Sequence, residues 1–329
     1  MRILLLAKQP ERTTRLKMFE GTLTALGYEV IVPSFGTKNW IKIVGLAKKV
    51  AKDSKADVVH VFNVPDIIYH NFAQHRGDFL KKFIYDYRSP WGLELQQTFG
   101  PPGRIFGEHF EQNLAMNADA ITTVNTPLRE KVMSYVSGTN VHIIPNYPSR
   151  SFSAQAEEHL LHEEAGRKPI IFIGRVCIQE GIRKLLEIAR SIPDQEFWIV
   201  GGGPFVRWHL WRMTPNVKYL GWQPHDRVAS LVKKASLCLI PREDSVITPY
   251  STDKSVWKLN EYLNMGRLVV ASGIIQEQPR KNLIIVKSSE LKNTIIEHLD
   301  DKPRRLMESD YRYWDSNIEE IREVYESLA

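Results

Sequence analysis

Short apolar runs alternate with segments of helical pattern along nearly the whole chain. Each run is only a few residues long and mostly apolar throughout, with no strict alternation of apolar and polar positions. Strands of that kind are covered on both faces and belong to parallel sheets with right-handed crossovers. The predicted strands are residues 3–6, 29–32, 58–62, 83–86, 120–123, 141–144, 170–173, 197–200, 217–220, 237–240, 268–271 and 283–286.

Helical patterns fill the intervals between these strands. The first predicted helix, residues 14–26, has Gly27 as its C-terminal cap. Another, residues 127–135, opens with Thr126 as N-cap and Pro127 at its first position. The other helices singled out by pattern are residues 40–54, 302–309 and 313–328. Two α/β, doubly wound sheets in succession are therefore the predicted architecture.

The chain divides near its middle. Residues 149–168 are polar, show no clear period and form the predicted linker. We therefore expect two Rossmann-like domains that face each other across a cleft. Residues 1–150 are the first domain, residues 151–305 the second, and residues 306–329 a C-terminal helix that returns to the first domain.

Composition excludes several classes of protein. With 43% apolar and 25% charged residues in 329, the chain is neither disordered nor fibrous. The apolar stretch at the N-terminus is too short for a signal peptide, and none reaches the ~18 residues of a membrane span. Cys177 and Cys238 lie in apolar runs without metal-like spacing, which predicts buried, inert thiols in a cytoplasmic protein.

The net charge of +6 lies entirely in the first half of the chain. Residues 1–150 hold 19 basic and 13 acidic side chains, whereas the remainder holds 25 of each. Helix 41–55 concentrates lysines at Lys42, Lys48, Lys49, Lys52 and Lys55. They form either a solvated helix face or a surface that docks on anionic lipid. An aromatic-rich segment, residues 91–106, is predicted as a long loop that either forms the rim of an acceptor cleft or covers the core.

Glycines follow two predicted strands of the second half: Gly174 after the first, and Gly201, Gly202 and Gly203 after the second. Open parallel sheets bind ligands beyond the carboxyl ends of their strands, and glycines there let backbone N–H groups approach phosphate oxygens. The second loop is not a dinucleotide fingerprint, because its third glycine is missing and Pro204 stands where the helix should start. The pattern argues against a hydride-transfer enzyme and indicates a tight turn beside a ligand.

The richest stretch for chemistry is residues 241–266, a charged loop that becomes a helix. Within it Lys254, Lys258 and Glu261 are spaced at i, i+4 and i+7, so they share one face if all three are helical. Two cations and a carboxylate on one face suit a ligand with phosphates and a hydroxylated ring. The same spacing equally fits a solvated face with an ordinary salt bridge.

These segments together resemble the retaining glycosyltransferases of family 4, which have the GT-B fold. That family's donor signature pairs two acidic residues with seven residues between them, then a glycine and a strand. Asp253 and Glu261 match the spacing, and Gly266 precedes strand 268–271. The resemblance covers almost the whole chain, and its other segments are Gly174-Arg175, Glu180-Gly181-Ile182, and residues 57–60, 118–121, 144–146, 200–204 and 217–221.

The resemblance implies roles for the matching residues in binding a nucleotide-sugar. Glu261 would hold the ribose hydroxyls, and Arg175 would neutralise the diphosphate. Asp253 would lie near the donor sugar, and Lys258 would face the nucleotide or its phosphates. The base would lie near Gly221 and Trp222, and the glycines along the phosphates would be Gly174, Gly202 and Gly203.

Three positions and one loop depart from the family pattern. The glycine-rich loop that is common after the first strand is missing, and Lys8-Gln9-Pro10-Glu11-Arg12 replaces it. Glu180 stands where the family has a second diphosphate cation, so Lys254 or Lys258 is expected to substitute for it. Asp253 replaces a glutamate and is one methylene shorter. Arg88 stands where the family has a histidine that points at the sugar. These departures concern recognition of the sugar and of the acceptor more than binding of the diphosphate.

The leaving nucleoside diphosphate develops negative charge that the enzyme must stabilise. The chain has no Asp-x-Asp motif and no His/Cys cluster, so a metal-free mechanism fits. The retention that the resemblance implies would then use a front-face path, without a nucleophile-plus-base pair. His60 lies in predicted strand 58–62, and a histidine in such a position is more often structural than catalytic.

With this resemblance, we expect a cytoplasmic, metal-independent, retaining glycosyltransferase of hexosyltransferase type, with no cofactor besides its UDP- or GDP-linked donor. The expected acceptor is a glycan or a lipid-linked molecule, with the protein peripheral on an anionic membrane. No nucleic-acid partner is expected, because no reading motif accompanies the basic half. Two alternatives stay open: a GT-B-fold nucleotide-sugar epimerase, which would need further acid/base groups, and a non-catalytic nucleotide-sugar-binding module.

Overall fold

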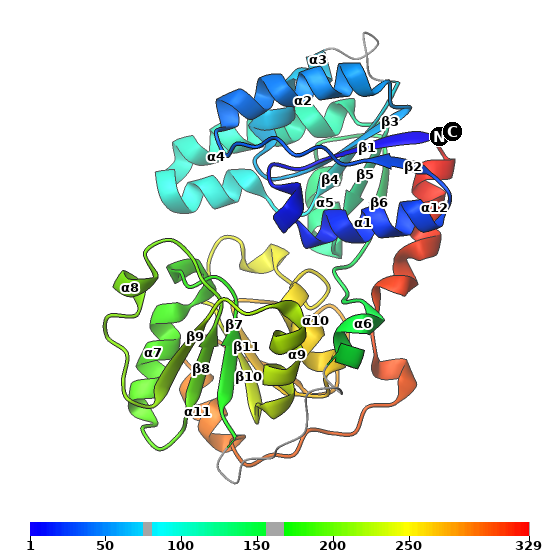
Figure 1. The fold of residues 1–329 in the computed structure, drawn as a ribbon. Helices are drawn as coiled ribbons and strands as arrows, with labels where there is room; N and C mark the ends of the chain where they lie inside the picture. The colour runs from blue at the N-terminus through cyan, green and yellow to red at the C-terminus, as the bar shows by residue number, and fades with distance from the viewer. Residues whose placement is uncertain (75–80, 156–167, 329) are drawn as a thin grey trace. The chain divides into compact units, whose positions relative to one another are not determined.

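A computed structural model of the chain describes residues 1–74, 81–155 and 168–328. The chain divides into two compact units. Unit 1 comprises Met1–Asn146 together with Asp315–Ala329, and unit 2 comprises Tyr147–Trp314. Each unit is a parallel sheet with helices packed on its faces (Figure 1). The prediction of two Rossmann-like, doubly wound folds is confirmed.

Unit 1 is built on a six-stranded sheet of order β2-β1-β3-β4-β5-β6, with every neighbouring pair parallel. Its strands are β1 (Arg2–Leu6), β2 (Glu29–Ile31), β3 (Val58–Phe62), β4 (Lys82–Tyr87), β5 (Ala120–Thr123) and β6 (Asn140–Ile143). All of β3 and almost all of β1 and β4 are buried, as continuous apolar runs require of central strands. The chain order reverses between β1 and β3, which makes that point the topological switch of the sheet.

The helices of unit 1 are α1 (Thr14–Ala25), α2 (Trp40–Ser54), α3 (His70–Gln74), α4 (Trp91–Asn117), α5 (Thr126–Met133) and α12 (Ile318–Glu326). Gly27 follows α1 with φ +85°, as its predicted capping role requires. The predicted N-cap of α5 is wrong by one residue. The side chain of Asn125, not of Thr126, accepts a hydrogen bond from the Leu128 N–H at 2.9 Å.

The predicted aromatic loop at residues 91–106 is also wrong, because this segment belongs to α4. Its helical pattern is interrupted only at Gly100, where φ is +67° and two prolines follow. The helix folds back on itself there. A Cβ on Gly107 would lie 2.5 Å from the Cα of Gly92, so the two parts of α4 touch backbone to backbone. Glycines at this contact, rather than aromatic residues, decide the shape of the segment.

Buried polar contacts hold unit 1 together. Arg15 of α1 pairs with Asp86 of β4 at 2.8 Å, and both side chains are buried. His60 of β3 meets the hydroxyl of Tyr325 in α12 at 2.6 Å and stacks on Phe62. Burial lowers the pKa of His60 to about 3, so its imidazole is neutral. These contacts agree with a structural rather than a catalytic role for His60.

Unit 2 is built on a second six-stranded parallel sheet, of order β12-β11-β10-β7-β8-β9. Its strands are β7 (Ile170–Ile173), β8 (Phe197–Val200), β9 (Val217–Gly221), β10 (Leu237–Pro241), β11 (Leu268–Ser272) and β12 (Leu283–Ile285). The chain runs from β7 to β9 on one side and then returns to place β10 beside β7. The topological switch of this sheet therefore lies between β7 and β10.

The helices of unit 2 are α6 (Arg150–Gln155), α7 (Ile182–Ser191), α8 (Val206–His209), α9 (His225–Lys234), α10 (Trp257–Asn264) and α11 (Leu291–Glu297). Two apolar clusters cover the two faces of its sheet. Of the predicted linker 149–168, residues 150–155 form α6, and residues 156–167 lie outside the described residues.

Two predictions near the C-terminus need correction. The helix expected at residues 302–309 does not form: the segment has no regular secondary structure, apart from a short 3₁₀ turn at Glu308–Asp310. The side chain of Asn282 explains this, because it bonds both the N–H and the carbonyl of Arg304 at 2.7 and 2.9 Å and holds the segment beside β12. The helix expected at residues 313–328 begins only at Ile318, after a 3₁₀ turn at Trp314–Asn317.

The two cysteines are free thiols in different surroundings. Cys238 lies in β10 and is fully buried, as predicted, and burial raises the pKa of its thiol. Cys177 is only partly buried, so the predicted burial is wrong for this residue: it lies in the loop beyond the carboxyl end of β7, just before the short 3₁₀ helix Ile178–Glu180. Within the described ranges, each helix falls short of the length and apolar character needed to cross a membrane.

Candidate functional site

The carboxyl ends of β7 and β10 meet at the topological switch of unit 2. Gly174 and Arg175 follow β7, and Arg242 follows β10. The backbone of Gly181 packs directly on the end of β10. A Cβ at that position, where φ is +79°, would lie 1.8 Å from the carbonyl oxygen of Pro241. Only glycine allows this approach, which brings Glu180 to the switch point.

Glu180 accepts bonds from two cations at this point. The Lys258 Nζ lies 2.7 Å from Oε2, and the Arg242 Nη2 lies 2.9 Å from Oε1. We call these three residues the Glu180 cluster. Burial alone would raise the pKa of Glu180, but Lys258 and Arg242 outweigh burial and hold the pKa well below its ordinary value. The carboxylate is therefore charged at every physiological pH.

Helix α10 places Lys258 beside the glycine loop that follows β7. The Lys258 ammonium lies 4.5 Å from the ring centroid of Phe172 and only 3.0 Å from where a Gly174 Cβ would stand. The hydroxyl of Tyr262, one turn further along α10, accepts the Ile173 N–H at 2.9 Å and fixes the helix against the end of β7. Burial lowers the pKa of Lys258, and Glu180 opposes this effect.

The glycines after β7 and β8 form two loops in direct contact. A Cβ on Gly201, where φ is +131°, would lie 2.0 Å from the carbonyl oxygen of Gly174. The Val176 N–H donates to the carbonyl of Gly202 at 3.1 Å, and Gly203 packs beside the same residue. Arg175 projects from this pair of loops as an exposed side chain, and in the part of the chain that the structure describes it has no ion pair.

Glu261 lies on α10 and is 5% exposed. Its Oε1 lies 3.1 Å from the Nε2 of His225, the first residue of α9, and this hydrogen bond raises the pKa of His225. Sequence reasoning missed His225. A sequence signal for His225 does exist, because it lies shortly after the end of β9. There Gly221 has φ +68° and Trp222 is 75% exposed.

Asp253 and Lys254 lie apart from the Glu180 cluster. Helix α10 begins at Trp257, so Lys254 is not helical and the condition for a common face with Lys258 and Glu261 is not met. Lys254 instead pairs with Glu277 at 3.1 Å. Asp253 is fully buried, and its Oδ1 accepts the Glu277 N–H at 2.6 Å. This hydrogen bond holds the segment around Glu277 in place. Burial raises the pKa of Asp253.

Arg88 belongs to unit 1 and directly follows β4. Its backbone N–H donates to the Asn63 Oδ1 at 3.0 Å, and its Nε donates to the Asn63 carbonyl. The amide of Asn63 in turn donates to the carbonyl of Ser89 at 2.7 Å. Asn63 therefore holds the loop of Arg88 at the carboxyl edge of the unit 1 sheet. Burial lowers the pKa of Arg88.

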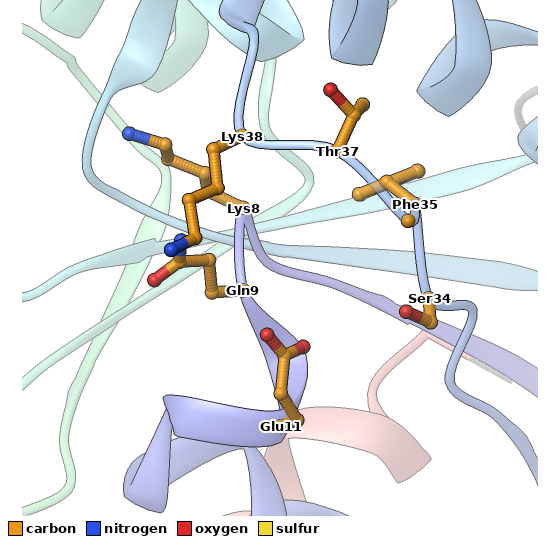
Figure 2. Close-up of a pocket in the computed structure, with 8 residues that line it drawn as sticks. Lys8, Gln9, Glu11, Ser34, Phe35, Thr37 and Lys38 are labelled. Atoms are coloured by element: carbon orange, nitrogen blue, oxygen red, sulfur yellow. The ribbon is translucent and has the colours of Figure 1, made fainter.

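Unit 1 has a cavity of about 200 Å³ beyond the carboxyl ends of β1 and β2 (Figure 2). Two lysines, Lys8 and Lys38, line it, and burial together with Lys38 lowers the pKa of Lys8. The other lining groups offer an amide, a carboxylate, two hydroxyls and an aromatic ring, from Gln9, Glu11, Ser34, Phe35, Gly36 and Thr37. Mixed donors and acceptors of this kind suit a hydroxylated ligand.

The charges at the unit 2 switch favour an anion. Arg175, Arg242 and Lys258 bring three positive charges, and Glu180 brings one negative charge. The glycine loops after β7 and β8 lie beside them, and glycine loops at the carboxyl ends of strands are common in diphosphate sites. Among the described residues, no three His, Cys, Asp or Glu side chains gather as a metal site.

Residues 167–301 match the family model described as Glycosyl transferases group 1. This segment includes the Glu180 cluster, both glycine loops and the whole of α10. Unit 2 therefore carries a domain of the glycosyltransferase superfamily. No curated protein matches the chain in sequence.

Several solved structures share the fold of the chain. A sucrose-phosphate synthase from Thermosynechococcus elongatus superposes with a TM-score of 0.74 at 16% identity, over 99% of this chain and 98% of that one. Anabaena HepE in complex with UDP and glucose gives 0.67 at 14% identity, over 99% and 100%. A UDP-GlcNAc 2-epimerase from Methanocaldococcus jannaschii gives 0.55 at 11%, over 99% of each chain. At these identities the likeness concerns the fold, and the predicted GT-B fold is confirmed.

Proposed function

We propose that the protein is a retaining, metal-independent glycosyltransferase of family 4 type that transfers a hexose from a UDP- or GDP-linked donor. The observation that carries the proposal is the cation-rich pair of glycine loops at the switch point of unit 2. There Lys258, Arg242 and Arg175 surround the edge where the strands end. The match of this region to the group 1 glycosyl transferase model supports the same conclusion.

In this proposal, each part of the site acts on the nucleotide-sugar through its own chemistry. Arg175, Lys258 and the loop N–H groups neutralise the charge that develops on the leaving diphosphate. Glu261 accepts the ribose hydroxyls, and Trp222 flanks the base. Asp253 acts by holding the segment around Glu277 that borders the donor sugar. The structural neighbours crystallised with UDP support the choice of a nucleotide ligand.

The acceptor side belongs to unit 1 in this proposal. The cavity beside Lys8 and Lys38 offers both donors and acceptors to a glycan, and Arg88 lies at the same carboxyl edge of the sheet. The lysines of α2 would bring the protein to an anionic membrane that holds a lipid-linked acceptor. The protein would then act in the cytoplasm, at the membrane surface.

Calorimetry with UDP and GDP tests the donor site. Replacing Glu261 by Ala should weaken nucleotide binding by about 10- to 100-fold, since it removes hydrogen bonds to a charged acceptor. Arg175→Ala should mainly lower kcat with a nucleotide-sugar, by about 100-fold or more. The matched controls are Glu297→Ala and Arg305→Ala, on exposed parts of unit 2. Unchanged affinity in the Glu261 variant would contradict the assignment, and so would turnover that needs Mg²⁺ or Mn²⁺ after EDTA treatment.

A nucleotide-sugar epimerase is the second candidate, because epimerases are among the structural neighbours. Epimerisation needs acid/base groups beside the sugar, and Glu180 is held in its charged form by two cations. Incubation of a UDP-sugar without acceptor separates the candidates. Appearance of an epimer would favour the epimerase, slow release of UDP would favour the transferase, and binding without either product would favour a non-catalytic module.

A further inference from the structure

One loop of unit 2 exposes several large apolar side chains at once. Helix α8 and its flanks carry Phe205, Trp208 and Trp211, which are 79%, 57% and 67% exposed. Phe205 holds a left-handed backbone with φ +58° just before α8, which is costly for a bulky residue. Large exposed apolar clusters on a protein surface mark an interaction site.

Arginines surround these aromatic rings. The guanidinium of Arg212 lies 4.3 Å from the ring centroid of Trp211, and that of Arg183 lies 5.6 Å from the ring of Trp208. Together with Arg190 and Arg207, they make four exposed arginines on α7, on α8 and just after α8. We call these four arginines with Phe205, Trp208 and Trp211 the α7–α8 surface.

A groove of about 400 Å³ lies within this surface, between α7 and the loop of α8. One carboxylate, Glu187, lines it, and that carboxylate is already paired with Lys184 at 3.2 Å. From residue 201 to residue 218 the chain has no acidic residue. The groove is therefore cationic and rimmed by tryptophans, which fits a surface that is anionic and only partly apolar.

We propose that the α7–α8 surface docks on an anionic phospholipid bilayer. Tryptophans settle at the level of the lipid headgroups, where the apolar ring and the polar indole N–H are both satisfied, and a phenylalanine adds an apolar ring that enters the acyl boundary. The arginines meet the lipid phosphates with their planar donors. Neither contribution alone anchors a protein stably, but both together do. The surface differs from the lysine face of α2 and from the donor site, so it stands without the proposed function.

Vesicle sedimentation tests the proposal with the full chain. The parent should sediment with vesicles of equal parts phosphatidylglycerol and phosphatidylcholine, and not with phosphatidylcholine alone. Each arginine near an anionic surface contributes about fivefold to the partition coefficient, so the double variant Arg183→Gln, Arg190→Gln should bind about 30-fold more weakly. The variant Trp208→Ser, Trp211→Ser should also lose binding, and it should do so at high salt as well as at low salt.

Two controls separate this surface from others. Phe99→Ser with Ile105→Ser removes two exposed apolar residues of α4, 66% and 71% exposed, and should leave sedimentation unchanged. Replacing Lys42, Lys48, Lys49 and Lys52 by Gln should change sedimentation less than the arginine variant does. All variants should keep the parent's Tm and its affinity for UDP, whatever that affinity is.

Three outcomes would overturn the proposal. One is a parent that ignores anionic vesicles at low salt, and another is an α7–α8 variant that sediments as well as the parent. The third is a parent that forms a dimer by analytical ultracentrifugation which the tryptophan variant breaks, with no vesicle binding. That result would assign the surface to a second copy of the chain.

Discussion

Glu180 shows how a single residue changes the electrostatics of a site built from glycine loops. Two cations, Arg242 and Lys258, converge on its carboxylate, and all three side chains are mostly buried. Removal of one partner from a buried pair leaves an uncompensated charge, which costs more than the pair itself contributes. The same carboxylate opposes the approach of a diphosphate, because it reduces the local positive charge from three to two.

We therefore expect Glu180→Gln to lower the stability of the fold while it strengthens the binding of a nucleotide. The variant keeps the size of the side chain but loses its charge, so it should unfold more easily by about 1–3 kcal/mol at neutral pH. It should also bind UDP more tightly, because two cations lose their internal counter-ion. Urea denaturation and calorimetry measure the two effects. Weaker binding together with lower stability would mean that Glu180 itself positions the ligand.

The pH dependence of this variant follows from the direction of the pKa shift. The folded-state pKa of Glu180 is lowered, so its stabilising contribution is fully present above the ordinary value of 4.5 and is lost as pH falls through the folded value. The difference in unfolding free energy between parent and Glu180→Gln should therefore shrink in acid. A difference that stays constant from neutral pH into strong acid would contradict this interpretation.

His225 provides a second residue-level test, because its hydrogen bond to Glu261 raises its pKa. The pair stabilises the fold below the ordinary histidine pKa of 6.5 and loses that contribution as pH rises through the higher folded value. An NMR titration should give a pKa above 6.5 for His225 and a lower one in Glu261→Gln. Equal values in the two proteins would show that the hydrogen bond does not form in solution.

At the level of elements, the strands were predictable and the ends of helices were less so. Continuous apolar runs identify central parallel strands, because each must be buried on both faces. The break of α4 at Gly100 was not predictable from aromatic content, since the deciding contact is between Gly92 and Gly107, which are distant in sequence. Likewise, Asn282 holds residue 304 in a non-helical segment through a contact that no local pattern contains.

The sequence could indicate which residues belong to the candidate site, but not which side chains pair with one another there. Gly174, Arg175 and Lys258 follow from strand ends and from the family resemblance. The pairing of Glu180 with both Arg242 and Lys258 depends on three segments that come together only in the folded sheet. Spacing alone left open whether Lys254 shares a helical face with Lys258 and Glu261, because nothing local shows that α10 begins as late as Trp257.

The close approach of Gly181 to β10 leads to an element-level prediction. Gly181→Ala would place a Cβ 1.8 Å from the Pro241 carbonyl at a positive φ, so the start of α7 must move away from β10. We expect a loss of roughly 3 kcal/mol or more in unfolding free energy, since both strain and steric overlap act. Gly202→Ala is the matched control, because open space surrounds that position. Chemical denaturation of both variants measures the effect, and equal stability would refute the argument.

At the scale of the whole molecule, the chain returns to unit 1 after completing unit 2. Helix α12 packs Ile321, Val324 and Tyr325 into unit 1, all three fully buried. Its contacts to His60 and His142 join residues that lie far apart in sequence, at 2.6 Å in each case. The stability of unit 1 therefore depends on the last residues of the chain.

Tyr325→Ala should consequently destabilise unit 1 by about 3–5 kcal/mol, the usual cost of removing a large buried ring. Tyr325→Phe, the matched control, keeps the ring and loses one hydrogen bond, for about 1 kcal/mol. Both cysteines of the chain lie in unit 2, and Cys238 is fully buried there, so its thiol reports on unit 2 alone. We expect circular dichroism to show earlier unfolding of Tyr325→Ala in urea, while labelling of Cys238 follows the parent curve. If Cys238 becomes reactive at the same lower urea concentration, the two units unfold together and α12 stabilises the whole molecule.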